Sequence, residues 1–425
     1  MEKSIRISLQ TIAYTFFFSL LCFPDYIGFR FGIAWNLQRI IIVIALIWIL
    51  RNNIRANQLL HTIGNHKGNW LILLYLSVCF LTMVVRKDLG SFMRPMMDYV
   101  MTYYLTLYFL KYEIKMDSFF RFFILCVWIC GIFGILEAIF KFNVFSIFPT
   151  IEGLGGSGIE RDAAYRICVN GRHPLGYGLY LLLAFPLVCF NQKQRTMDIL
   201  NNPILEILIL VNVFCTGSRS TLGLALFEIV LVLIFSRYEQ IKKAMVVLLP
   251  LILAMCLSLI LFSNSELVHK LYVKLVVMFD GAFNTNYAGK WLNYNSLNLE
   301  GSSNYRYYLP KIFTLPDLNP FLGLGIGHNF HTTIEGIEIQ SIDNFYVSQY
   351  IKYAYPGLFT LSLFLFSKIK DLLISLFTSR DDIFKVFFIG LLVYFINLWF
   401  VDDLETLKLI FMIFGVLTHR RESHI

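Results

Sequence analysis

Charged side chains are scarce in this chain of 425 residues. Asp, Glu, Lys and Arg make up 15% of it, whereas a soluble domain carries about 25%. That scarcity argues against an ordinary soluble globular protein. The formal charge of +8 is then best explained by loops that face anionic lipid headgroups, and no nucleic-acid partner is expected.

Clusters of metal ligands are also lacking. The eight cysteines lie mostly inside apolar runs, with no CxxC pair and no spaced Cys/His group, so neither a zinc site nor a disulfide framework is expected. No Asp-x-Asp pair occurs, and the glycine-rich stretch NPFLGLGIGHNF (319–330) is neither a dinucleotide-binding nor a Walker motif. We therefore expect no metal and no cofactor. We expect these glycines to let their loop pack closely on the rest of the protein.

Apolar residues, in contrast, are abundant. Hydrophobic residues make up 57% of the chain, and the mean hydropathy is +0.65. A bilayer core about 30 Å thick needs about 20 apolar residues per helix. Twelve runs fit that need, near 8–23, 37–50, 70–85, 95–110, 119–140, 173–190, 203–216, 219–236, 243–263, 344–366, 383–400 and 404–418. The sequence predicts an all-α polytopic membrane protein with about 12 transmembrane helices.

Lys and Arg predict the orientation of these helices. They gather in every second connection, and such basic loops stay on the cytoplasmic side. Both termini are therefore expected in the cytoplasm, and the two long connections, 142–172 and 264–342, on the outer side. Long connections are seldom without a function. The chain divides into nine helices over 1–263, a long outer loop over 264–342 and three helices over 343–425.

The stretch ERDAAYRICVNGRHPLGYG (160–178) places several cations on the predicted outer side. Arginine presents a planar fork that pairs with two phosphate oxygens. Arg166 and Arg172 are therefore candidate anion ligands, with His173 beside them. The alternative is a solvated loop, or pairing with neighbouring acidic residues. His173 alternatively marks the start of the next helix, whose first turn holds a proline.

The stretch CTGSRSTLG (215–223) puts Arg219 between two apolar runs. A charge at the edge of a bilayer is rare unless it is paired or faces a polar cavity. Gly217 allows a turn, Ser218 suits the cap of the next helix, and the N–H groups of a helix start attract anions. The alternative is that Arg219 snorkels to lipid headgroups.

The long outer loop ends in further candidates. Tyr305 and Arg306 lie in SSNYRYYLPKIF, where tyrosines suit either the face of a sugar or an interfacial aromatic belt. His328 is either functional or simply solvent-facing. Asp343 and Asn344 stand where the chain enters the next helix. A carboxylate there suits a general base, and equally a helix cap.

The remaining charges have structural interpretations. Lys352 lies inside the run 344–366 and needs an acidic partner within the membrane, for which the candidates are Glu137, Glu206 and Glu228. Asp98 is one helical turn from Arg94, so these two residues are expected to pair. The carboxylates of the last outer turn are expected in solvent; they are Asp402, Asp403 and Glu405.

Taken in order, these motifs resemble the O-antigen ligase and Wzy-type polymerase family. The matching stretches are the Arg-rich loop before HPLGYGLYLLLAFP, then TGSRSTLGL, YRYYLPKIFTLPDLNPFLGLGIG and DNFYVSQYIKYAYPGL, which together span 160–360. The resemblance implies a GT-C-type architecture. It also implies a metal-independent glycosyltransferase, located in the bacterial inner membrane with its active face outside. Its donor would be an oligosaccharide carried on undecaprenyl pyrophosphate.

The resemblance also implies which residues act. Arg219, Arg306 and Asp343 match the positions that are catalytic in this family. The family's ligases typically have His where this chain has Asp343, which favours a polymerase. The residues expected to bind pyrophosphate or glycan around them are Arg166, Arg172, His173, Ser218, Tyr305, His328 and Asn344.

The expected function is therefore a polymerase of O-antigen, capsule or exopolysaccharide that joins lipid-linked repeat units. Its partners would be the lipid-linked donor and acceptor, membrane lipids and a chain-length regulator. One alternative is a ligase that moves the glycan to lipid A core or to another acceptor. A second is a flippase for the same glycan, for which the expected sign is a pair of interrupted helices around a midplane site.

Overall fold

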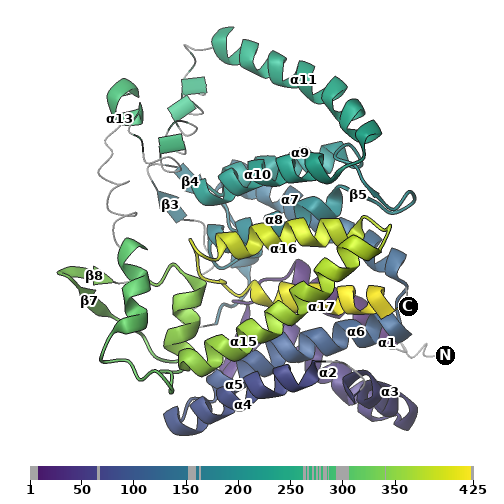
Figure 1. Ribbon diagram of the computed structural model, residues 1–425, viewed down its shortest axis with the longest axis vertical. Coiled ribbons are helices and arrows are strands. Elements are labelled where there is room, and N and C mark those ends of the chain that lie inside the picture. The colour runs from purple at the N-terminus through teal and green to yellow at the C-terminus, as the bar shows by residue number, and fades with distance from the viewer. Residues whose placement is uncertain are drawn as a thin grey trace.

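A computed structural model of the chain describes residues 8–64, 68–151, 159–161, 164–261, 287–292, 306–339 and 341–422, with the isolated positions 265, 268–269, 272–273, 276, 279–280 and 285. Most of these residues are helical, as the sequence predicts. Long helices lie side by side and run between two ends of the molecule (Figure 1).

Each of the twelve apolar runs contains a helix. The α-helices are α1 (Leu9–Leu21), α2 (Leu37–Leu50), α3 (Asn53–Gly64), α4 (Asn69–Arg86), α5 (Gly90–Arg94), α6 (Thr102–Tyr112), α7 (Met116–Phe140), α8 (Pro174–Val188), α9 (Pro203–Cys215), α10 (Arg219–Phe235), α11 (Tyr238–Leu261), α13 (Tyr287–Leu292), α15 (Phe345–Thr378), α16 (Ile383–Asn397) and α17 (Leu407–Glu422). A π-helix, η1 (Pro95–Met101), joins α5 to α6, and short 3₁₀ turns form η2 (Val144–Ile147) and η3 (Leu309–Thr314).

Two described helices, α4 and α7, are long and apolar enough by composition to cross a membrane. A third span results if α2 and α3, which are bent by 116° at their joint, count as one. Four shorter apolar helices, α1, α8, α9 and α16, accompany them. The figure of about twelve transmembrane helices stays a prediction.

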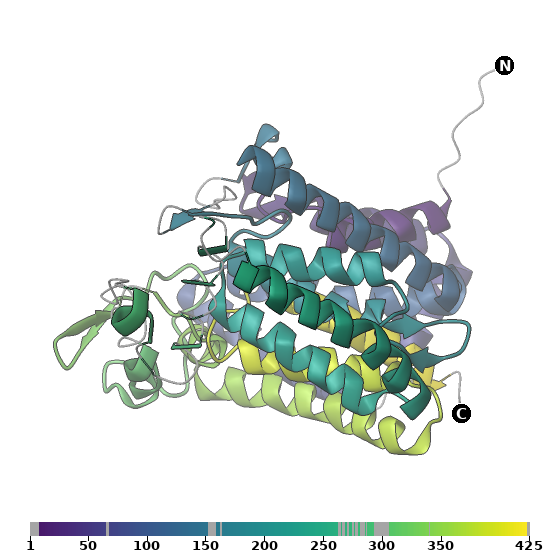
Figure 2. The same ribbon diagram turned by 90° about the horizontal axis from the view of Figure 1, so that it is seen from above.

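Small antiparallel hairpins join the helices. They are β1 (Gly28–Phe31) with β2 (Ile33–Asn36), β3 (Ile159–Arg161) with β4 (Ala164–Arg166), β5 (Phe190–Asn191) with β6 (Thr196–Met197), and β7 (Thr332–Ile334) with β8 (Ile337–Ile339). We call the end that holds β3–β4 and β7–β8 the loop end, and the end that holds β5–β6 and the last turn of α17 the terminal end. Figure 2 shows that these two ends are opposite.

The helix α15 is interrupted near its start. Ala354 has a non-helical conformation (φ 55°, ψ −166°) two residues before Pro356, where a proline restricts the chain and removes a backbone donor. The carbonyl oxygens of Ile351 and Lys352 accept hydrogen bonds from the backbone N–H groups of Leu324 (2.8 Å) and Gly325 (3.1 Å). The glycine-rich loop therefore completes the broken helix.

Gly323 explains how the loop approaches so closely. A Cβ atom at this position would lie 2.2 Å from the carbonyl oxygen of Lys352, a backbone atom that cannot move aside easily. The prediction that these glycines permit close packing is confirmed.

Gly323→Ala should therefore destabilise the protein by about 1–3 kcal/mol, because the added methyl group forces the loop off α15. Gly223→Ala is the matched control, since a Cβ atom there meets nothing within 4 Å. Thermal unfolding in detergent would measure both variants. Equal melting temperatures would contradict the close approach.

Candidate functional site

The turn before α10 brings two of the candidate arginines to one place. Gly217 adopts a left-handed conformation (φ 63°), and Ser218 caps α10 by accepting a hydrogen bond from the N–H of Thr221. Arg219 is then the first residue of the helix. The predicted cap is confirmed.

Arg166 comes from β4 and packs against this turn. Its Nε donates to the carbonyl oxygen of Thr216 (2.7 Å), and a Cβ atom on Gly217 would lie 3.1 Å from the Arg166 side chain. The Arg166 side chain is buried. A glycine is thus needed at 217 for a second reason, because any side chain there would displace Arg166.

Arg306, from the middle of the long loop, meets Asp343, which directly follows that loop. The Arg306 Nη2 atom lies 2.9 Å from Asp343 Oδ2, and the Ser341 hydroxyl donates to Asp343 Oδ1 (2.7 Å). Both charged side chains are partly exposed, at 35% and 25%. Their partner in the motif, Tyr305, lies outside the described residues.

Asn344 fixes the start of α15 beside this ion pair. Its side-chain oxygen accepts from the N–H of Val347, and its amide donates to the carbonyl oxygen of Trp399 (3.0 Å). Asn344 therefore caps α15, a role for which the sequence also suited Asp343. This leaves the Asp343 carboxylate oriented by Ser341 and Arg306.

Arg172 and His173 have structural partners. Arg172 forms an ion pair with Glu405 (2.8 Å), and the His173 Nδ1 atom accepts from the N–H of Leu175 as the cap of α8 (3.2 Å). The His173 contact is the predicted helix start, whereas Arg172 pairs with a distant carboxylate and not with Glu160 or Asp162, the partners that the sequence suggested for the arginines of this stretch.

The prediction that the carboxylates of the last outer turn lie in solvent was wrong for Asp403 and Glu405, while the Asp402 side chain is partly exposed. Glu405 binds Arg94 (2.7 Å) as well as Arg172, and Asp403 is buried, with the Tyr99 hydroxyl donating to it (3.3 Å). Burial, together with the neighbouring carboxylate of Asp402, raises the pKa of Asp403 above its usual range, although Arg94 opposes the shift. The loop between α16 and α17 is therefore a buried, charged connection.

Two other pairings differ from the prediction. Asp98 pairs with Arg39 on α2 rather than with Arg94. Lys352 pairs with Asp402 (3.4 Å) rather than with Glu137, Glu206 or Glu228. The Ser348 hydroxyl also donates to Asp402 (3.0 Å). Helical spacing suggested Arg94 for Asp98, and for Lys352 the sequence could not show which helices and loops lie beside α15.

His328 lies exposed on the glycine-rich loop. This loop also docks on the joint between α4 and α5, where the N–H of Gly327 donates to Asp88 Oδ2 (3.0 Å) and the N–H of Ile326 donates to the Ser91 hydroxyl (2.9 Å). Burial alone would raise the pKa of Asp88, but hydrogen bonds from Ser91 and Gly327 outweigh it and lower that pKa.

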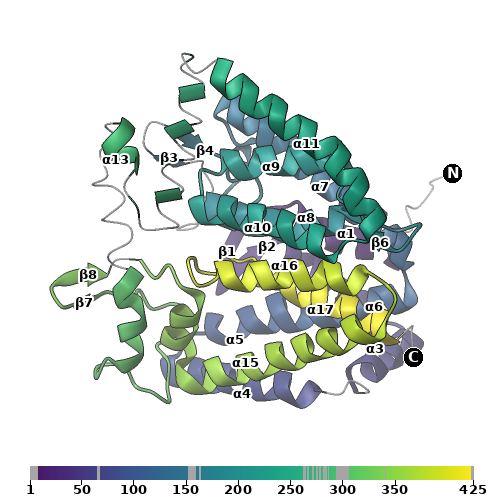
Figure 3. The ribbon, with the colours of Figure 1, turned by 45° about the horizontal axis from the view of Figure 1, so that its top comes forward.

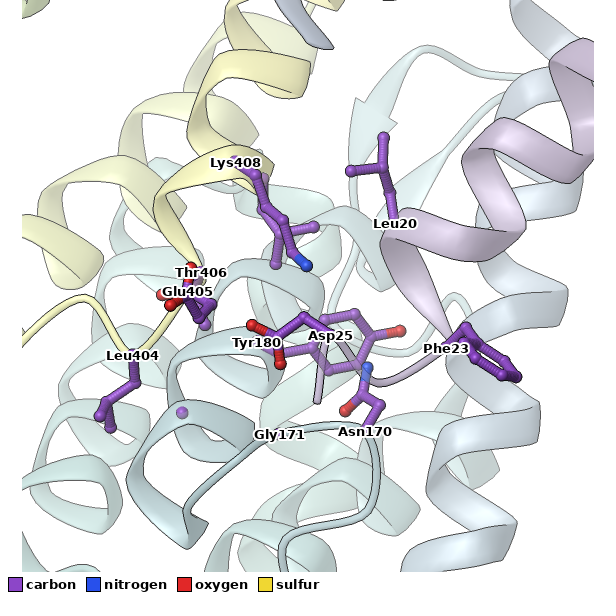
Figure 4. A pocket seen from close by; sticks show the side chains of 12 residues that line it. Leu20, Phe23, Asp25, Asn170, Gly171, Tyr180, Leu404, Glu405, Thr406 and Lys408 are labelled. Carbon is purple, nitrogen blue, oxygen red and sulfur yellow. The ribbon is translucent and has the colours of Figure 1, made fainter. Parts of the chain in front are cut away.

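A small cavity lies between α1, α8 and the start of α17 (Figure 4). Its volume is about 30 Å³, enough for a water molecule or two. Figure 4 shows the amino group of Lys408 directed toward the carboxylate of Asp25 and the ring of Tyr180. None of the predicted site residues lines it.

The candidate residues thus form three groups at the loop end. Arg166 lies with the turn that holds Ser218 and Arg219, Arg306 lies with Asp343, and Arg172 lies in the buried charge network. The α16–α17 loop links the second and third groups, because its Trp399 contacts Asn344 and its Glu405 binds Arg172. Among the residues that the structure describes, no group of three or more His, Cys, Asp and Glu side chains could hold a metal ion.

No family model matches the chain, and no curated protein matches it in sequence.

Removal of the Glu405 charge should be costly. Glu405→Gln leaves Arg94 and Arg172 without their shared partner, and breaking such a buried pair costs about 3–5 kcal/mol. Glu335→Gln is the control, because the Glu335 side chain is 59% exposed and, among the described residues, forms an ion pair with Lys311 alone. Thermal unfolding in detergent would compare them. A Glu405→Gln variant as stable as the control would contradict the network.

The attachment of the glycine-rich loop should weaken in acid. Because its folded-state pKa is lowered, Asp88 contributes stability that is present above the ordinary aspartate pKa of about 3.9 and is lost as the pH falls below it. The melting temperature of Asp88→Asn should therefore differ from that of the wild type at about pH 6 and approach it at about pH 3. Asp317→Asn, at an exposed position two residues before that loop, should show no such convergence. A constant difference across this range would exclude the contribution of Asp88.

Proposed function

We propose that the protein is a membrane glycosyltransferase that polymerises lipid-pyrophosphate-linked repeat units on the outer face of the bacterial inner membrane. The observation that carries the proposal is the Arg306–Asp343 ion pair, formed by a residue from the middle of the long loop and the residue that directly follows the loop. At the same end of the molecule, Arg166 packs on the turn that begins α10 with Arg219. In the proposal these two groups form one site, which combines a carboxylate with several guanidinium groups.

That combination suits transfer from a lipid pyrophosphate. An acceptor hydroxyl oxygen attacks the anomeric carbon of the donor sugar, the bond from that carbon to the pyrophosphate oxygen breaks, and the hydroxyl proton passes to Asp343. Negative charge grows on the departing pyrophosphate, and fixed guanidinium groups stabilise it. In the proposal Arg219 and Arg306 supply this charge, and Arg166 supports the turn that carries Arg219.

The arrangement around Asp343 suits a base that has to stay in one place. Ser341 and Arg306 each bind one of its two oxygens, and Asn344 caps α15 in its stead. The carboxylate is partly exposed, so an acceptor sugar reaches it from the outer face. In this proposal the twelve helices form a GT-C-type membrane domain with both termini in the cytoplasm.

The interruption of α15 favours a second candidate, a flippase for the same lipid-linked glycan. Broken helices line the binding sites of many transporters, and α15 is broken at Ala354. This break lies close to the loop end of a 34-residue helix, rather than at its middle. The experiment below separates the two functions.

Arg219→Ala, Arg306→Ala and Asp343→Asn should each lower the rate of glycan polymerisation by about 10²–10³-fold, because each removes a group that acts in the transition state. Polymerisation would be measured in membrane vesicles supplied with lipid-linked repeat units. Arg30→Ala is the control, since Arg30 is an exposed arginine on β1 outside the site.

The products decide between the functions. Single repeat units that reach the outer face but stay unpolymerised in the three variants support the polymerase. Loss of their delivery supports the flippase instead, and transfer only to an acceptor that is not lipid-carrier-linked identifies a ligase. Full polymerisation in the three variants would contradict the proposed site.

A further inference from the structure

A basic pocket lies at the terminal end, away from the site described above. Its volume is about 240 Å³, eight times that of the cavity in Figure 4, and its lining residues are Gln194, Arg195, Arg237, Ser379, Arg380 and Asp381. This volume accommodates a phosphate group together with several waters.

The three arginines come from three separate connections. Arg195 lies in the β5–β6 turn, Arg237 lies between α10 and α11, and Arg380 lies between α15 and α16. Figure 3 shows β6 at the end where α10 passes into α11. Folding therefore gathers into one pocket charges that would repel each other if nothing bound between them.

The acidic side chains nearby neutralise these arginines only in part, because each carboxylate is shared with a closer cation. Asp381 is bound by Arg420 (2.6 Å) and Asp382 by Lys385 (2.7 Å). Arg195 and Arg237 approach the two carboxylates only at 3.9 Å and 3.8 Å.

Arg380 has no ion pair or side-chain hydrogen bond within the described part of the chain. It is exposed, as are the side chains of Arg195 and Arg237, at 55% and 57%. The pocket therefore keeps an excess of positive charge that faces outward.

Large apolar side chains stand beside these arginines. Tyr238 follows Arg237 directly and is 78% exposed, and Phe377 precedes Arg380 by three residues and is 83% exposed. Ile234, one turn before Tyr238, is also exposed. A ligand that fits this surface has a negatively charged head for the pocket and apolar chains for its rim.

We propose that this pocket binds the phosphodiester headgroup of an anionic phospholipid. Arginine forks pair with phosphate oxygens bidentately, and basic pockets at the cytoplasmic ends of membrane helices suit anionic lipid heads. The inference rests on the membrane placement in the proposed function but not on the polymerase activity. Its test therefore measures binding and needs no glycan.

The test titrates the purified full-length protein in detergent with dioleoylphosphatidylglycerol, dioleoylphosphatidylcholine or sodium phosphate, and follows the melting temperature and the bound lipid by native mass spectrometry. Phosphatidylglycerol should raise the melting temperature saturably, because a ligand of the folded state stabilises it. Phosphatidylcholine, whose headgroup has no net charge, should act far more weakly.

The combined variant Arg195→Gln, Arg237→Gln, Arg380→Gln should weaken phosphatidylglycerol binding by about tenfold or more, since it removes several charge-assisted hydrogen bonds. Arg380→Gln alone provides a variant that removes no contact among the described residues and should weaken binding in the same direction. The matched control Arg51→Gln, Arg121→Gln, Lys370→Gln removes as many exposed charges outside the pocket and should change binding by less than about twofold.

Three outcomes would overturn the proposal. They are unchanged binding in both pocket variants, an equal loss in the control, and equal stabilisation by the two lipids. Stabilisation by sodium phosphate equal to that by phosphatidylglycerol would assign the pocket to free phosphate and overturn the lipid as its source. A failed polymerisation assay would leave all of these binding results standing.

Discussion

A buried charge has to be paired, and this constraint organises the loop end of the protein. Glu405 binds both Arg94 and Arg172, and so ties together α5, the start of α8 and the loop between α16 and α17. A lone buried ion costs several kcal/mol, so these three segments are held in register. The same loop reaches α15 through Asp402 and Trp399. The start of α15, where Asn344 follows Asp343, is thereby fixed relative to α8.

The proposed chemistry requires groups that stay in place more than it requires an enclosed cavity. A growing glycan is large, and a partly exposed carboxylate is accessible to it. Asp343 is oriented on both oxygens, and Arg166 is fixed by the carbonyl oxygen of Thr216. Asp343 and the turn that Arg166 supports belong to one framework of helices. In the proposed reaction the first accepts a proton, and the second lies beside the departing pyrophosphate.

The long apolar helices could be predicted from the sequence because each depends on a continuous apolar run, whereas the polar helix α3 has no such run and was not predicted. The cap at Ser218 and the close approach at Gly323 were predictable as well, since each follows from the local chain. The partners of charged residues were not. Arg39 on α2 pairs with Asp98 on η1, and Lys352 on α15 pairs with Asp402 in the loop between α16 and α17. Periodicity carries no information on which helices adjoin, so Asp403 and Glu405 read as solvent-facing residues although packing buries them. For the site residues, the alternation of basic and non-basic connections predicted that they lie at one end of the molecule. It did not predict that they divide into three groups.

The break in α15 binds a short segment of the long loop, residues 320–325, to that helix. Two carbonyl groups left unsatisfied at the break are completed by the amides of Leu324 and Gly325, and Tyr355 returns the contact by donating its own N–H to the carbonyl oxygen of Pro320 (3.1 Å). A displacement of this segment would leave backbone groups of α15 without hydrogen-bond partners. Hydrogen bonds in both directions therefore hold the segment and the helix together. Lys352, whose carbonyl oxygen binds this segment, pairs through its side chain with Asp402, so the segment is connected through α15 to the loop between α16 and α17.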